Sequence, residues 1–263
     1  MKQNILKSLL LALLLAMLPQ VASAYDFMVD GLCYNKNVDG TSVTVTYEGT
    51  GADGYGYSNL NGDLVIPPSV TYDGTTYSVT KIGDTAFRNC TGLTSIVVEN
   101  GNPKYDSRNS CNAIIETESN TLIVGCNSTI IPNSVTTIGN YAFSGCSGLT
   151  SIKSKSLSPD KVSMDSSVFY EVDKSNCTLY VPQSTKGVYQ ATWPWSDFVN
   201  IVEVPFAPGD VNYDDECTGS DVTALYNFIL YNDNSAIVNG DQNGDGEVTG
   251  SDVTAVYNII LGL

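Results

Sequence analysis

After the first 24 residues, the chain contains short stretches in which apolar and polar residues alternate. Between residues 25 and 58, two such stretches flank Asp39 and Gly40, a pair that favours a tight turn. Alternation of apolar and polar residues is typical of a half-buried strand. This part therefore predicts a β-hairpin, which would cover one open end of whatever follows it.

Between residues 60 and 204, here called the repeat segment, the apolar positions recur at a fixed interval. The stretch Thr80–Ile96 returns 56 residues later as Thr136–Ile152, and both copies contain Ile-Gly-x-x-Ala-Phe-x-x-Cys and end in Leu-Thr-Ser-Ile. Each copy follows an Ile-Pro-x-Ser-Val phrase. The Ile-Pro and Leu-x-x-Ile phrases predict short strands, whereas apolar spacings of three and four predict a single helical turn.

An interval of 56 residues corresponds to about two coils of a solenoid, with residues 102–127 as additional chain between the copies. A coil buries its inner face only against the next coil, so neighbouring strands would stack in parallel. Cys90 and Cys146 occupy the same position in the two copies and would both point inward. Two coils apart, they would be separated by roughly 10 Å at the usual strand spacing, which is too far for a disulfide.

The last part, residues 205–263, is here called the C-terminal segment and contains one pattern twice, with an offset of 31 residues. Oxygen-bearing side chains occupy loop positions 1, 3, 5, 9 and 12, and an apolar run at helical spacing follows each loop. This is the pattern of an EF-hand calcium loop, and it predicts two Ca²⁺ sites. The predicted ligands are Asp210, Asn212, Asp214, Glu216, Thr218 and Asp221 in loop one and Asp241, Asn243, Asp245, Glu247, Thr249 and Asp252 in loop two, with Glu216 and Glu247 acting through backbone carbonyls.

Two positions inside the loops distinguish the copies. Position 6 turns sharply and favours glycine, which loop two has at Gly246, whereas loop one has Asp215. Aspartate tolerates the left-handed backbone at a cost, so we expect loop one to bind calcium more weakly. Position 8 carries Cys217 in loop one and Val248 in loop two, which indicates that Cys217 is an inward-facing substitute for valine.

The net charge of −16 on the 263-residue chain is unevenly distributed. From Glu203 to the end there are 11 acidic residues and no lysine or arginine, whereas residues 25–202 carry 17 acidic and 10 basic residues. Such self-repulsion opposes compaction, and two bound Ca²⁺ would neutralise four of these charges. The same negative charge argues against nucleic acid as a partner.

The first 24 residues are typical of a cleaved secretory signal. Lys2 and Lys7 precede an apolar run over residues 9–18, and small residues occupy positions 22–24. No later apolar stretch approaches the roughly 20 residues of a membrane helix, so we expect an exported chain without a membrane span. Export to the periplasm and export to the cell exterior fit this pattern equally. Seven cysteines suit disulfides in such a chain, but their odd number and spacing favour buried thiols for most of them.

The residues needed for common catalytic chemistry are missing or already used. The chain has no histidine, which removes Ser-His-Asp, Cys-His and histidine-ligated zinc sites. A glycosidase needs only two carboxylates. However, the hairpin, the repeats and the insertion account for all residues from 25 to 204 and leave no segment for a catalytic domain. We therefore expect a non-catalytic protein, in which the 2 tryptophans and 16 tyrosines serve packing more than a carbohydrate platform.

The repeated phrase, together with Ile-Pro-x-Ser-Val, resembles the BspA-like leucine-rich repeats of bacterial exported proteins. The resemblance covers residues 60–204, and residues 25–59 look like the leader module common in that family. It implies a curved solenoid that presents a ligand-binding or adhesion surface to an unknown protein or glycan. It does not imply catalysis.

The twin loops resemble type I dockerins, because aspartate occupies position 12 and a helix begins directly after each loop with none written before it. This resemblance covers residues 209–263 and implies an all-α module that folds around two Ca²⁺ and binds a cohesin-type protein. It also implies contacts at loop positions 10 and 11 and at helix positions 17, 18 and 22. These residues are Gly219, Ser220, Tyr226, Asn227 and Tyr231 in copy one and Gly250, Ser251, Tyr257, Asn258 and Gly262 in copy two.

The two copies agree at four of these five positions, which is compatible with two alternative orientations on the partner. Many dockerins carry a Ser-Thr pair and basic residues at these places, whereas this chain has neither. The difference concerns which cohesin would fit.

Together these patterns predict an α+β protein: a leucine-rich-repeat solenoid with short parallel strands and a β-hairpin N-terminal cap, followed by a small all-α dockerin-like module. The expected boundaries are a signal peptide (1–24), the cap (25–59), the solenoid (60–204), a linker (205–209) and the two-loop module (210–263). The module would attach the chain to a cohesin-type partner in a polysaccharide-degrading or cell-surface assembly. The alternative is a surface adhesin in which the calcium module is only a structural cap or spacer.

Overall fold

The computed structural model describes residues 25–49, 57, 60–88, 92–214, 216–233 and 237–263. The expected signal peptide, Cys90 and Asp215 lie outside these residues. Strands dominate the described chain and are accompanied by three α-helices, so the fold is of the α+β kind. None of the described helices is long and apolar enough to cross a membrane.

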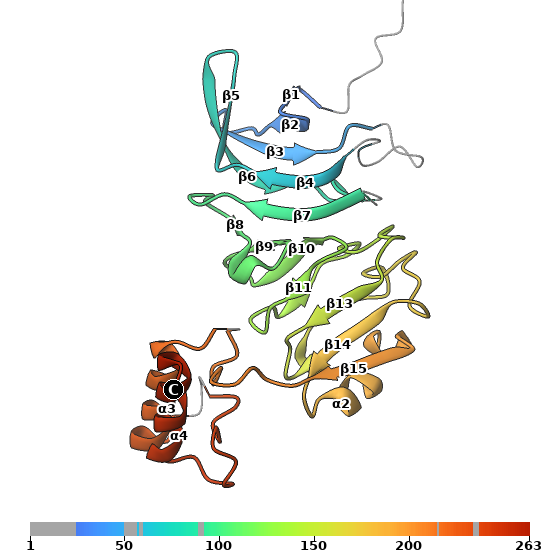
Figure 1. Cartoon of the computed structure of the whole chain (residues 1–263). Coiled ribbons are helices and arrows are strands. Elements are labelled where there is room, and N and C mark those ends of the chain that lie inside the picture. Colours follow the sequence, from blue (N-terminus) through green and yellow to red (C-terminus); the bar gives the residue numbers. More distant parts are fainter. Residues whose placement is uncertain (1–24, 50–56, 58–59, 89–91, 215, 234–236) are drawn as a thin grey trace, which may run out of the picture.

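The strands stack along one elongated body, and two helices pack against each other beside the end of this body that carries the last strands (Figure 1). The strands are β1 (Phe27–Val29), β2 (Leu32–Lys36), β3 (Ser42–Thr46), β4 (Asn61–Ile66), β5 (Ser69–Tyr72), β6 (Thr75–Ile82), β7 (Gly92–Val98), β8 (Tyr105–Asp106), β9 (Ala113–Glu116), β10 (Thr121–Gly125), β11 (Ile130–Ile131), β12 (Thr137–Ile138), β13 (Ser151–Ser154), β14 (Thr178–Pro182) and β15 (Asn200–Val204). The helices are α2 (Lys186–Ala191), α3 (Gly219–Tyr231) and α4 (Gly250–Leu261), with the short 3₁₀ turns η1 (Arg108–Ser110), η2 (Pro159–Lys161) and η3 (Trp195–Asp197).

The N-terminal strands form an antiparallel meander that continues into the repeat segment. β1 pairs with β2, and β2 pairs with β3 across the predicted turn. The Asp39 carboxylate accepts hydrogen bonds from the amides of Thr41 (2.8 Å) and Ser42 (2.8 Å), and Gly40 has the positive φ that the turn requires (68°). The far edge of β3 pairs in parallel with β6, so the predicted hairpin is part of a larger sheet of order β1-β2-β3-β6-β5.

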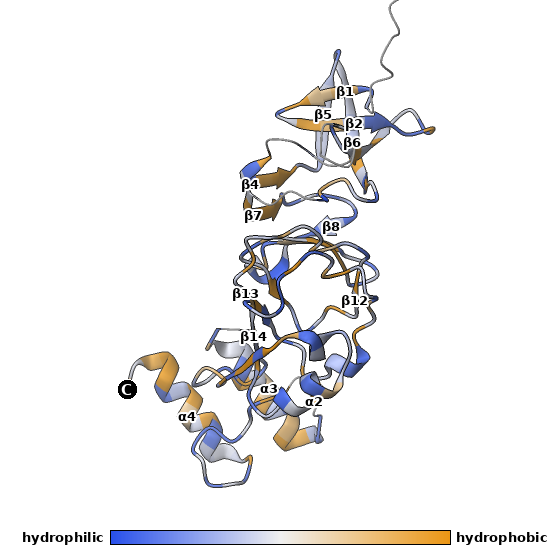
Figure 2. Ribbon diagram, turned by 90° about the vertical axis from the view of Figure 1, so that its right-hand side faces the viewer, coloured by the Kyte–Doolittle hydropathy of each residue, from blue (hydrophilic) through white to orange (hydrophobic). Residues whose placement is uncertain are grey.

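The strands predicted from the Ile-Pro and Leu-x-x-Ile phrases lie side by side in parallel. β4, which ends at Ile66, pairs with β7, and β11, which ends at Ile131, pairs with β13. The ladder continues in parallel from β13 through β14 to β15. β12 lies on the opposite side of the stack from β13 (Figure 2) and pairs in parallel with β10. Each Ile-Pro phrase therefore pairs with the Leu-x-x-Ile phrase that follows it in the same copy.

The additional residues 102–127 interrupt this stacking at a place here called the seam. They contribute β8, β9 and β10, and β9 pairs antiparallel with both β8 and β10. The buried side chains form one cluster before the seam and a second cluster after it. Ile114 belongs to the first cluster, whereas Ala113 and Ile115 belong to the second. Because successive side chains of a strand point to opposite faces, β9 joins the two cores.

The Ile-Gly-x-x-Ala-Phe-x-x-Cys phrases form consecutive turns, and the predicted helical turn is wrong. In the second copy the amide of Ala142 donates to the carbonyl of Gly139 (3.2 Å), and the amide of Ser144 donates to the carbonyl of Tyr141 (2.9 Å). Tyr141 has a φ of 61°, and its counterpart Thr85 has a φ of 64°. A residue in the left-handed region interrupts a right-handed helix, so the apolar residues reach the core from turns instead.

Five of the described cysteines are buried thiols, and no described cysteine is in a disulfide. The five are Cys33, Cys111, Cys126, Cys146 and Cys177. Burial raises the pKa of Cys33, Cys111 and Cys177 to about 11, which keeps these thiols protonated at neutral pH. The interpretation of most cysteines as small hydrophobes is confirmed for these five positions.

Trp195 lies inside the second core cluster and is fully buried. Its ring centroid lies 5.4 Å from that of Phe169 and 5.5 Å from that of Tyr189. The Tyr189 hydroxyl is itself satisfied, because it donates to the carbonyl of Ser156 (2.9 Å). Trp193, two residues earlier, is 57 % exposed. The packing role expected of the tryptophans therefore holds for Trp195, whereas Trp193 faces solvent.

Candidate calcium-binding loops

The first loop brings three carboxylates together. Asp210, Asp214 and Asp221 each offer one oxygen, and these oxygens lie within 4.8 Å of one another. Asp210 and Asp221 are buried, and Asp214 is half-buried. Carboxylates at such distances repel one another unless a cation lies between them. The structure thus gathers the side chains predicted as ligands at positions 1, 5 and 12.

Asp221 closes the first loop and also begins the helix that follows. One carboxylate oxygen accepts the amides of Val211 (2.8 Å) and Asn212 (3.2 Å), and the other accepts the amide of Thr218 (2.8 Å). Thr218 is the N-cap of α3, and its side chain accepts the amide of Ser220 (3.2 Å), which completes a capping box with Asp221. Ordering the loop therefore also orders the first turn of α3.

The second loop repeats this hydrogen-bond network. The Asp252 carboxylate accepts the amides of Gln242 (2.8 Å), Asn243 (3.1 Å) and Thr249 (2.8 Å), and Thr249 caps α4 as Thr218 caps α3. Burial raises the pKa of the Asp252 carboxyl, but the amide hydrogen bonds outweigh burial and the pKa is lowered on balance. The side chain therefore stays in the ionised form that a cation requires.

In loop two, the aspartate at position 1 is held by backbone amides of its own loop. In loop two, Asp241 accepts the amides of Gly244 (2.7 Å), Asp245 (3.1 Å) and Gly246 (2.9 Å). Within the described chain, a carboxylate cluster as close as that of loop one is not found in loop two. Gly246 has a φ of 89°, which is the sharp turn expected at position 6. Because Asp215 lies outside the described residues, the weaker affinity of loop one stays a prediction.

The donor set suits a hard cation such as Ca²⁺. Carboxylate, amide and hydroxyl oxygens alternate along both loops, and these are the ligands that calcium prefers. From Glu203 onward the sequence contains 11 acidic residues and no lysine or arginine, so no cationic side chain of this segment balances them. Glu216 and Glu247 are exposed, which fits their expected contribution through backbone carbonyls. When bound, Ca²⁺ would supply positive charge that draws the ends of each loop together.

A small apolar core lies between the loops and the two helices. Its buried members are Val211, Val222, Ala224, Leu225, Val253 and Val256. Cys217 and Val248 both pack against this cluster, which confirms that the two residues are equivalent. The amide of Val238 donates to the carbonyl of Val211 (2.8 Å), which ties the chain before loop two to loop one. The two loops and helices thus share a single core.

The residues expected to face a partner lie at the surface. Asn227 is half-buried, and the exposed ones are Gly219, Ser220, Tyr226, Tyr231, Gly250, Ser251, Tyr257 and Asn258. The Ser220 hydroxyl accepts a hydrogen bond from the Asn212 amide group (3.1 Å), and Ser251 accepts one from Asn243 (2.8 Å). Each of these serines is therefore tied to a predicted calcium ligand of its own loop.

Exposed apolar side chains accompany these residues, and sequence reasoning did not single them out. Ile229, Leu230, Ile260 and Leu261 are 37 %, 65 %, 39 % and 66 % exposed. Figure 2 shows the hydrophobic colour at the C-terminal end of α4. The signal was present in the sequence, because both apolar runs continue to the end of the helix without the polar positions that a one-sided helix has.

The two helices end differently, which makes the copies unequal at one predicted contact position. Tyr231 is the last residue of α3 and is 74 % exposed. Its counterpart Gly262 lies just beyond α4 and is the left-handed C-cap, with a φ of 68°. Copy two therefore offers no side chain at this position.

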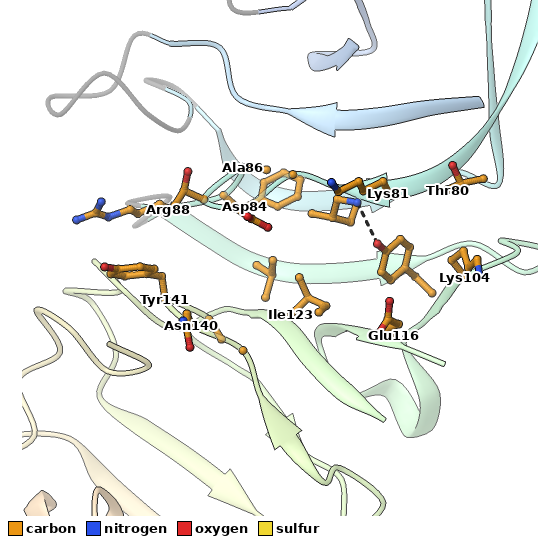
Figure 3. Close-up of a pocket in the computed structure, with 18 of the residues that line it drawn as sticks. Thr80, Lys81, Asp84, Ala86, Arg88, Lys104, Glu116, Ile123, Asn140 and Tyr141 are labelled. Atoms are coloured by element: carbon orange, nitrogen blue, oxygen red, sulfur yellow. Dashed lines mark hydrogen bonds between the residues drawn. The ribbon is translucent and has the colours of Figure 1, made fainter. Parts of the chain in front are cut away.

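A groove of about 840 Å³ crosses the repeat segment at the seam. It is lined from both sides of the insertion, with Lys81, Asp84, Arg88, Lys104, Glu116 and Tyr141 around it (Figure 3). The Arg88 guanidinium lies 4.9 Å from the centroid of the Tyr141 ring. Tyr105 of β8 closes one side, where its hydroxyl accepts the amide of Ile82 (3.0 Å). The groove is thus a second candidate site, separate in sequence from the calcium loops.

Comparison with known proteins assigns both parts of the chain. The family described as BspA type leucine rich repeat region matches residues 69–121 and 115–205 in 6 copies. The family described as dockerin type I domain matches residues 208–261. No curated protein matches the chain.

Several solved structures also resemble the chain. A leucine-rich repeat protein from Eubacterium ventriosum is 19 % identical over 54 % of this chain and 32 % of that protein, with a TM-score of 0.28. A leucine rich cell surface protein from Faecalibacterium prausnitzii is 17 % identical over 68 % and 29 %, with a TM-score of 0.25. A leucine-rich repeat protein from Bacteroides ovatus is 18 % identical over 60 % and 55 %, with a TM-score of 0.28. This chain spans less than two thirds of the length of each.

Proposed function

Because the chain belongs to the BspA type leucine-rich repeat family and carries a dockerin type I domain at its C-terminal end, we propose that it is an exported binding protein. In this proposal a solenoid over residues 60–204, capped by residues 25–59, presents a ligand or adhesion surface. After the linker at 205–209, the module at 210–263 attaches the chain to a cohesin-type partner when two Ca²⁺ are bound. Both kinds of module are non-catalytic.

The observation that carries this proposal is the double role of the residues around Asp221. Its carboxylate belongs to the acidic cluster of loop one and also accepts the amide of Thr218 at the start of α3. Ser220, between these two residues, is exposed and bonded to Asn212 of the same loop. An ion in the loop would therefore hold the proposed partner-facing residues in place, and loop two repeats this arrangement. This coupling is what a calcium-dependent attachment module requires.

We expect immobilised cohesin-type modules to capture the chain over residues 25–263 when Ca²⁺ is present. Substituting Tyr226→Ala and Tyr257→Ala together should weaken capture by at least about tenfold, because two large exposed anchors are lost. Each single variant keeps the tyrosine of the other copy and should lose less. Tyr180→Ala, at an exposed tyrosine on β14, is the matched control and should change nothing. Undiminished capture of the double variant would refute the assignment of this face.

For the ligand of the repeat segment, we place the binding surface on the groove at the seam. The acidic and basic side chains that line it balance, and they are Asp39, Asp84, Glu116, Lys81, Arg88 and Lys104. A ligand held there needs hydrogen-bonding groups more than net charge. Tyr141, 37 % exposed, adds a ring that an apolar ligand face can contact. We infer that the ligand is a neutral oligosaccharide.

This inference is tested by titrating neutral oligosaccharides of different linkage into the chain. One of them should bind, and Tyr141→Ala should weaken its binding about fivefold to tenfold, which is what the loss of one ring contact predicts. Tyr180→Ala again serves as the control with an exposed tyrosine outside the groove. No binding by any oligosaccharide, or an unchanged affinity in Tyr141→Ala, would reject the groove as a glycan site.

One observation favours the alternative in which the C-terminal segment only caps the solenoid. Tyr213 of loop one is buried, and Lys155 of the repeat segment lies 5.4 Å from its ring centroid, so the loop contacts the neighbouring coils. A pure cap would bind calcium but would not capture any cohesin-type module. The capture experiment therefore separates the two functions.

A further inference from the structure

The two calcium loops differ at position 4, which is Tyr213 in loop one and Gly244 in loop two. Both residues have a positive φ, 63° and 77°. Glycine adopts this conformation freely, whereas tyrosine adopts it at a steric cost. A Cβ atom at Gly244 would meet nothing within 4 Å, so close packing does not require a glycine at this position of loop two. A large ring in loop one is explained only if it makes a contact that offsets the cost.

Tyr213 makes that contact with the linker and the repeat segment. It is 8 % exposed although it lies on a loop. Its ring meets the ring of Phe206 edge-on, with centroids 5.1 Å apart, and Lys155 Nζ lies 5.4 Å from its centroid. Burial raises the pKa of the Tyr189 phenol, and the nearby Tyr213 phenol raises it further. The first calcium loop therefore lies against Lys155, the residue that follows β13.

Lys155 is an unusual residue to find at such a place, because it is only 2 % exposed. A buried ammonium group needs electrostatic compensation, and the face of a tyrosine ring supplies part of it. The chain from Glu203 onward adds 11 acidic residues and no basic residue. Docking the C-terminal segment over Lys155 therefore places a cation–π contact at the edge of a segment with net negative charge.

We propose that Tyr213 is the docking residue that holds the first calcium loop against the repeat segment, so that calcium binding at this loop and docking stabilise each other. The inference rests on the proposed function only in requiring that the loops bind Ca²⁺. Tyr213 lies between the predicted ligands Asn212 and Asp214, so ordering these ligands fixes the direction of the ring. The coupling is reciprocal, so loss of either event weakens the other. Loop two, with Gly244 in this position, has no ring that could make the same contact.

Calcium titration of the chain over residues 25–263 measures this coupling. Tyr213→Ala removes the ring and keeps a side chain at the strained position, so it should weaken one of the two sites about threefold to tenfold and affect the other site less. Tyr213→Phe keeps the ring and should retain most of the affinity. In a Lys155→Met background the effect of Tyr213→Ala should shrink to less than about twofold, because the contact is already broken. A Lys153→Met background is the matched control and should preserve the full effect.

Small-angle scattering in excess Ca²⁺ gives a second readout, in which Tyr213→Ala should enlarge the radius of gyration as the C-terminal segment leaves the repeat segment. Two bound ions with the same Tyr213→Ala effect in all three backgrounds would overturn the docking and leave the proposed function intact. A chain that binds no Ca²⁺ would overturn the proposed function. In that case an unchanged radius of gyration in Tyr213→Ala would overturn the docking as well.

Discussion

Removing calcium with EGTA should unfold α3 and α4, while the strands of the repeat segment should remain folded. The two helices have 13 and 12 residues, lengths at which isolated helices are marginal in water. Their shared core contains six buried residues, and the surrounding segment carries acidic residues without basic ones. Burial of so few apolar side chains does not by itself offset the repulsion among these carboxylates. At a free calcium concentration 100 times the dissociation constant, each ion would add about 2.7 kcal/mol of stability.

Far-ultraviolet circular dichroism of residues 25–263 measures this effect. The helical signal should fall on addition of EGTA and return with excess Ca²⁺, and a chain that ends at Val204 should show no change. Asp221→Ala and Asp252→Ala, each removing one loop-closing carboxylate and one capping box, should lower the signal even in calcium. A helical signal that is indifferent to EGTA in the full chain would show that the loops do not depend on the ion.

Trp195→Ala should destabilise the repeat segment by about 3–5 kcal/mol, which is the range for a large aromatic side chain lost from a packed core. Trp195 is fully buried. Its ring centroid lies 5.4 Å from that of Phe169 and 5.5 Å from that of Tyr189. The cavity would open between α2 and the last parallel strands, where coils that stack only on their neighbours have few other contacts. Urea unfolding of the chain that ends at Val204 isolates this transition.

Trp193→Ala is the matched control for this substitution. Trp193 is 57 % exposed, so its replacement should change the free energy of unfolding by no more than about 0.5 kcal/mol. Equal effects of the two substitutions would mean that Trp195 is not a core residue. A large effect of Trp193→Ala alone would mean that Trp193, and not Trp195, is the core residue.

The sequence predicted those features that depend on residue type at a fixed spacing. Ile66 and Ile131 end strands as expected, and the two loops place Asp210, Asp214 and Asp221 close together. Threonine before a helix, followed three residues later by aspartate, forms the capping box in both copies. In each case the chemistry of neighbours within a dozen residues decides the geometry, so it is visible in the chain.

Features that depend on distant contacts or on backbone choice were not predictable in the same way. The phrase around Tyr141 has helical apolar spacing, but its positive φ makes consecutive turns that bury the same side chains. The seam arises because β9 pairs antiparallel on both edges, which the apolar pattern of Ala113–Glu116 does not specify. The buried Tyr213 packs beside Lys155, which lies 58 positions earlier. Only the folded chain brings such residues together.

Capture of the chain over residues 25–263 by immobilised cohesin-type modules, compared in Ca²⁺ and in EGTA, tests the central claim most directly. The account predicts capture in Ca²⁺, release on addition of EGTA, and no capture at any calcium concentration for a chain that ends at Val204. Capture that persists in EGTA, or capture of the shortened chain, would contradict calcium-dependent attachment through the C-terminal segment. Failure of every cohesin-type module to capture a calcium-loaded, folded chain would leave that segment as a structural cap.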